Sequence, residues 1–89
     1  MSNQLSIESL DTLISAVEKY REELLKNKQI LVNAADLCDQ AMGSDAISQK
    51  HIAALNNAIN DLDRTSRIVE DVAVELREDR RKAIETLED

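Results

Sequence analysis

Any chemistry in this chain would have to start from one histidine and one cysteine, because His51 and Cys38 are the only residues of their types. A single histidine cannot supply a catalytic triad, a histidine relay or a histidine-based metal site within one chain. Cys38 lies near Asp36 and Asp39, and such negative neighbours disfavour the reactive thiolate. We therefore interpret His51 as flanking a helix contact and Cys38 as a structural cysteine.

The sequence also lacks motifs for binding a metal ion or a phosphate group. Asp36, Asp39 and Asp45 flank one short segment, but they lack the alternating acidic ligands and the terminal glutamate of a calcium loop. The single glycine, Gly43, cannot form a glycine-rich phosphate loop. We expect no catalytic residues, no cofactor and no metal, so the sequence predicts a protein that is not an enzyme.

The composition narrows the classes of partner. A net charge of −7 and a single aromatic residue, Tyr20, argue against binding to nucleic acid or to anionic lipid. No run approaches the roughly 20 apolar residues of a membrane span, and the first residues lack the basic and apolar regions of an ordinary signal peptide. We expect a cytoplasmic protein with a protein partner, exported only if a dedicated machine carries it.

A short segment around the only glycine divides the chain, which contains no proline. A glycine can end a helix in the left-handed conformation, and Ser44 or Asp45 can cap the helix that follows. Apolar residues recur at helical spacing on both sides, with Ser6 as the candidate N-cap of the first helix. The sequence predicts one all-α domain, an antiparallel two-helix hairpin with helices at about 6–42 and 46–87. The expected turn comprises Ala41, Met42, Gly43, Ser44 and Asp45.

The second helix carries a seven-residue repeat that predicts coiled-coil-like packing against other helices. Ser66 and Ala73 are small members of this repeat and would let helices approach closely, whereas Arg80 interrupts it. Because both apolar stripes exceed what one hairpin covers, we expect pairing with a second hairpin in a four-helix bundle. The second hairpin would be another copy or a helical domain of a larger protein. The expected partner interface comprises Leu10, Ile14, Val17, Leu24, Leu31, Ile52, Leu55, Ile59, Leu62, Val69 and Leu76.

Polar residues mark two further positions. Asn27 and Lys28 interrupt the stripe of the first helix, either as a long stem with its charged head in water or as a buried group that fixes register. Near the C-terminus the charges become dense, and Glu78 with Lys82 predicts an ion pair on the solvent side.

The acidic chain, with its two helices around a central glycine turn, resembles the WXG-motif family of type VII secretion systems. The segment Ala41-Met42-Gly43 matches the third position of that motif with Gly43, while Ala41 stands where tryptophan would be. The family's export signal is an aromatic residue followed four positions later by an acid. Val74 with Glu78 is the nearest match and lacks the aromatic ring.

The resemblance implies a partner or targeting factor, or a co-secreted substrate, in type VII secretion. The departures at Ala41 and Val74 fit a subunit that pairs with a larger effector, which would supply the missing half of the signal. The alternative is a cytosolic helical adaptor or structural subunit of a larger complex, without an export role.

Overall fold

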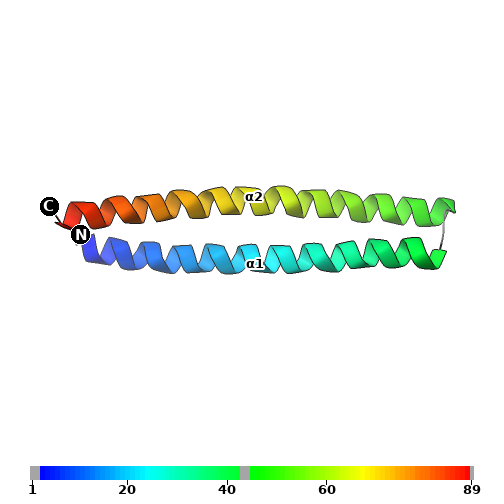
Figure 1. Cartoon of the computed structure of the whole chain (residues 1–89), viewed down its shortest axis with the longest axis horizontal. Helices are drawn as coiled ribbons and strands as arrows, with labels where there is room; N and C mark the ends of the chain where they lie inside the picture. The colour runs from blue at the N-terminus through cyan, green and yellow to red at the C-terminus, as the bar shows by residue number, and fades with distance from the viewer. Residues whose placement is uncertain (1–2, 43–44, 89) are drawn as a thin grey trace. The chain divides into compact units, whose positions relative to one another are not determined.

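Two helices account for almost all of the chain that the computed structural model describes, which comprises residues 3–42 and 45–88, with side chains for 7–41 and 45–87. Helix α1 spans Asn3–Met42 and helix α2 spans Ala46–Glu88 (Figure 1). The two helices pack against each other and no strand occurs in these ranges, which confirms the all-α hairpin. Neither helix contains a stretch apolar and long enough to span a bilayer. Pairing with a second hairpin stays a prediction.

The chain divides into two compact units, each combining a stretch of α1 with a stretch of α2. Unit 1 comprises Met1–Glu22 and Arg67–Asp89, and unit 2 comprises Glu23–Ser66. In unit 1, Asp11 pairs with Arg80 and Glu18 pairs with Arg77, so the α2 partner moves toward the N-terminus as the α1 residue moves toward the C-terminus. This order is that of antiparallel neighbours, and Figure 1 shows the blue start of α1 beside the red end of α2.

Helix α2 begins with an aspartate cap. The Asp45 carboxylate accepts a hydrogen bond from the backbone N–H of Ser48 at 2.7 Å, and its carbonyl accepts one from the N–H of Gln49 at 3.0 Å. The first bond satisfies an amide that the first turn of a helix leaves without a partner, and the second is the first regular bond of the helix. Of the two candidate caps Asp45 therefore fills the role, while Gly43 and Ser44 lie outside the described residues.

The start of α1 differs from the expectation. The helix begins at Asn3, so Ser6 lies inside it and is not its N-cap. Gln4 and Leu5 are good helix formers, which lets the helix extend upstream of the first clear apolar stripe.

The contact between the helices follows steps of three and four residues. Leu24 is 6% exposed and Ala73 is 3% exposed, and Ser66, a further member of the repeat of α2, is also buried. Apart from Leu24, the residues of the expected partner interface are half-buried within this one chain. The sequence repeat thus supplies the internal contact of the hairpin, which we call the seam.

Removing the cap of α2 should destabilise the hairpin. We expect Asp45→Ala to lower the free energy of unfolding by about 1 kcal/mol, because an amide of the first turn loses its acceptor. Asp45→Asn keeps a side-chain oxygen at the same position and should lose little. Urea unfolding followed by circular dichroism measures both, and equal losses in the two variants would exclude the capping role.

The seam should tolerate no charge. Leu62 is half-buried and Leu37 is 63% exposed, so the same leucine-to-aspartate change tests the two environments. We expect Leu62→Asp to cost more than about 2 kcal/mol, because the new carboxylate lacks a partner in an apolar contact. Leu37→Asp should stay within about 0.5 kcal/mol of the unchanged protein. Matching melting curves for the two variants would contradict this placement of the seam.

Candidate interaction surface

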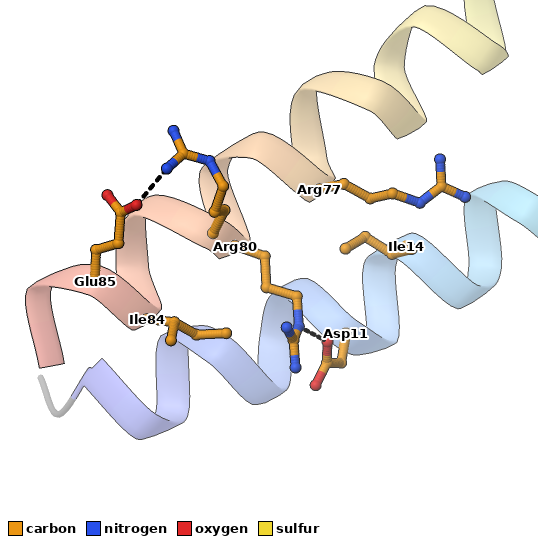
Figure 2. A pocket seen from close by; sticks show the side chains of 7 residues that line it. Asp11, Ile14, Arg77, Arg80, Ile84 and Glu85 are labelled. Carbon is orange, nitrogen blue, oxygen red and sulfur yellow. Dashed lines mark hydrogen bonds and ion pairs between the residues drawn. The ribbon is translucent and has the colours of Figure 1, made fainter. Parts of the chain in front are cut away.

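One side of unit 1 is crossed by ion pairs between the helices. Arg80 donates to Asp11 and Arg77 pairs with Glu18. Figure 2 shows Arg80 of α2 reaching to Asp11 of α1, and Ile14 and Ile84 line the same shallow pocket. Because these charged side chains are about 40–55% exposed, each pair contributes at most about 1 kcal/mol. The pairs therefore define how α2 lies on α1 more than they stabilise the fold.

Two basic residues lie within the apolar stripe of α1. The Lys28 ammonium is 2.8 Å from a carboxylate oxygen of Asp63, and the Lys28 side chain is 33% exposed. The ammonium of Lys28 therefore pairs with a carboxylate of α2 while the side chain remains partly in solvent, and a role in fixing register stays a prediction. Arg21 lies 3.6 Å from Glu70, and its Nε is buried without a hydrogen-bond partner among the described residues.

Arg21 was not predicted from the sequence to lie at the contact between the helices. The signal was present, because Arg21 follows Ile14 by seven residues and precedes Lys28 by seven. Such spacing places all three on the same side of a heptad-packed helix. Ala73 lines the same hollow as Arg21, and a small residue there leaves room for the long side chain.

The C-terminal part of α2 carries a cluster of charges centred on Arg81. This guanidinium donates from Nε to Glu78 at 3.1 Å and also binds Glu85. The hydrogen bond from Arg81 and its charge lower the pKa of Glu78, with a further contribution from Lys82. The hydrogen-bonded partner of Glu78 is thus Arg81 and not Lys82, because the forked guanidinium can satisfy both carboxylate oxygens.

The residues that resemble an export signal lie on the surface of α2. Val74 is 57% exposed and borders the hollow that Arg21 and Glu70 also line. Glu78 is exposed, but its carboxylate is already bound by Arg81. Val74 is therefore accessible to a partner, whereas the carboxylate of Glu78 is already bound by Arg81.

An apolar groove runs between α1 and α2 of unit 1. It is lined only by Ala16, Val17, Tyr20, Val69 and Val72, and we call it the groove. Tyr20 is 51% exposed and Val72 is 41% exposed, so much of the apolar lining faces solvent.

The groove and the ion pairs lie on opposite sides of the helices. Tyr20 follows Glu18 by two residues, and Val72 follows Glu70 by two. Two residues correspond to about 200° around a helix. From the sequence, Tyr20 was noted as the single aromatic residue, and this separate surface was not predicted. Leu13, which is seven residues before Tyr20 and 48% exposed, was a signal that could have revealed it.

The remaining candidate residues do not come together as a site. His51 is exposed, Cys38 is half-buried, and Asp36 and Asp39 are exposed. Within the described residues, histidine, cysteine and acidic side chains form no group of three that could hold a metal ion.

Comparison of the chain with protein-family models, with characterised proteins and with solved structures found no match.

Acid should weaken the cluster at the end of α2. Because Arg81 lowers the pKa of Glu78 below its ordinary value of 4.5, the stability that this pair contributes is present above that pH. It should be lost as the pH falls through the lower pKa of the folded state. A carbon-13 NMR titration of the Glu78 carboxyl measures the shift directly.

The matched variants are Arg81→Gln and Lys82→Gln. The first should raise the pKa of Glu78 toward its ordinary value, and the second should raise it less, since Arg81 both bonds to Glu78 and is the stronger charge partner. Equal effects would show that charge alone, and not the hydrogen bond, lowers this pKa.

Proposed function

We propose that this chain is a non-enzymatic helical subunit that acts by packing against a helical partner protein. The observation that carries the proposal is the set of large apolar side chains that the seam leaves exposed. In unit 1 this set comprises Leu13, Tyr20, Ile68, Val72, Val74 and Leu87, each between 41% and 59% exposed. Two of them, Tyr20 and Val72, line the groove together, and contiguous exposed apolar surface is characteristic of interaction sites.

The accessible area supports the same proposal. The chain exposes 6542 Å², whereas a folded monomer of 10.0 kDa is expected to expose roughly 5,200 Å². The excess of roughly 1,300 Å² is larger than the roughly 800 Å² that each partner contributes to a stable protein–protein interface of standard size.

The narrower form of the proposal is a WXG-like partner or targeting factor, or a co-secreted substrate, in type VII secretion. It rests on the architectural resemblance and on the exposure of Val74 at the position of the family's export signal. The partner would then supply the aromatic residue that this chain lacks.

A helical adaptor without an export role is the second candidate. The observation that favours it is the engagement of Glu78 by Arg81, because a carboxylate bound within its own helix is less available to a secretion receptor. The two candidates share the packing against a helical partner and differ in the role of Val74 and Glu78.

Copurification from the native cell, with mass spectrometry of lysate and medium, tests the proposal. We expect a helical partner protein in the lysate, and the type VII form also requires that the chain or its partner appear in the medium. Recovery of a stable monomer with no partner would contradict the proposal.

A triple variant separates the two candidates. Val74→Ala, Glu78→Ala and Arg81→Ala together should abolish export while partner binding is retained, if this part of α2 carries the targeting information. The matched control changes three exposed residues of the same kinds in unit 2, Ile30→Ala, Asp36→Ala and Lys26→Ala, and should leave export unchanged. Unchanged export in both triple variants would leave the adaptor role.

A further inference from the structure

We propose that the groove binds one amphipathic helix of a partner protein, and that this helix carries lysine or arginine along one edge of its apolar face. The inference rests on the proposed function and specifies the chemistry of the partner. The groove has an apolar floor, and its border on α2 differs in charge from its border on α1, which is why we infer this kind of partner.

The floor of the groove suits an apolar helix face. Val17 and Val69 lie near the seam, while Ala16, Tyr20 and Val72 form the walls. No charged side chain lines the groove, so an apolar side chain that fills it does not bury an ionised group. Valine and alanine walls between two helices leave the kind of channel that an amphipathic helix fills with residues spaced by three and four.

The α2 side of the groove is bordered by acids. Asp71, Glu75 and Asp79 follow one another at intervals of four residues, and we call them the acidic rim. At 100° per residue they fall within about 100° of Val72, on the side away from Val69 and therefore away from the seam. All three are exposed, and within the described residues none takes part in an ion pair.

The α1 side of the groove carries little net charge. Glu8, Ser9, Thr12 and Lys19 border it within unit 1, so its charged residues are one acid and one base. A helix lying in the groove would therefore meet three carboxylates along one edge, and one carboxylate and one ammonium along the other. Charge complementarity requires a basic edge over α2, and this requirement also sets which way round the helix face is presented.

A second copy of the chain suits the groove less well. Each copy would bring its own acidic rim and a single Lys19, and the pair would double a net charge of −7. Like charges opposed across an interface disfavour association. The acidic rim thus favours a distinct partner over self-association.

Two synthetic peptides test the proposal on the whole chain. Both peptides form an amphipathic helix with the same apolar face of leucine and alanine. The residues along one edge of that face are lysine in the first peptide and glutamate in the second. Tyr20 is the only aromatic residue of the chain, so tyrosine fluorescence reports on the groove when the peptides contain no aromatic residue. We expect the lysine peptide to change this fluorescence and to bind at least about tenfold more tightly than the glutamate peptide, with binding weakened by salt.

Matched variants locate the binding. Val72→Lys should lower the affinity for the lysine peptide at least about tenfold, whereas Val74→Lys, on the side of the ion pairs, should leave it unchanged. Neutralising the acidic rim with Asp71→Asn, Glu75→Gln and Asp79→Asn should remove the preference for the lysine peptide. Neutralising three exposed acids of unit 2, Asp36→Asn, Asp39→Asn and Asp61→Asn, alters the net charge equally and should preserve that preference.

Three results would overturn the inference: no binding of the lysine peptide, equal binding of both peptides, or equal effects of Val72→Lys and Val74→Lys in variants that circular dichroism shows to be helical. Light scattering of the chain alone gives a fourth, because a dimer that Val72→Lys dissociates would show that a second copy fills the groove. These outcomes are separate from failure of the proposed function. A copurified partner whose crosslinks avoid Tyr20 and Val72 would keep the function and refute the groove.

Discussion

The seam is the interaction on which every other feature of this hairpin depends. Two helices can cover only one side of each other, so burial at Leu24, Ser66 and Ala73 leaves the flanks of both helices in solvent. The two flanks of unit 1 differ in the side chains that they expose. Ion pairs such as Asp11 with Arg80 cross one flank, and valine, alanine and tyrosine line the other. The seam therefore leaves unit 1 with one flank crossed by ion pairs and one flank lined by apolar side chains.

The fold was largely predictable because its signals are local. Heptad spacing predicts the helices, and Gly43 with Asp45 predicts where one ends and the other begins. The choice of Asp45 as cap needed the structure, since Ser44 has an equally suitable side chain. The start of α1 at Asn3 was missed because good helix formers can extend a helix without an apolar signal.

The surfaces were less predictable because spacing alone does not tell which neighbour covers a side chain. Val17 and Tyr20 belong to one apolar stripe, yet Val17 is half-buried and Tyr20 is 51% exposed. The choice of Arg81 over Lys82 by Glu78 likewise depends on side-chain geometry. Sequence periodicity could predict that apolar surface would remain, and the three-dimensional arrangement was needed to show that some of it forms a groove.

The unequal sequence separations of the ion pairs have a consequence for folding. Lys28 and Asp63 are separated by 35 residues, whereas Asp11 and Arg80 are separated by 69. Doubling the length of a closed loop adds about 0.6 kcal/mol of chain entropy to the formation of a contact. Contacts of unit 1 therefore carry a greater closure penalty than those of unit 2, unless contacts nearer the turn have already joined the helices. The groove lies in unit 1, whose contacts carry this larger closure penalty, and a bound helix would offset part of it by holding α1 and α2 of this unit together.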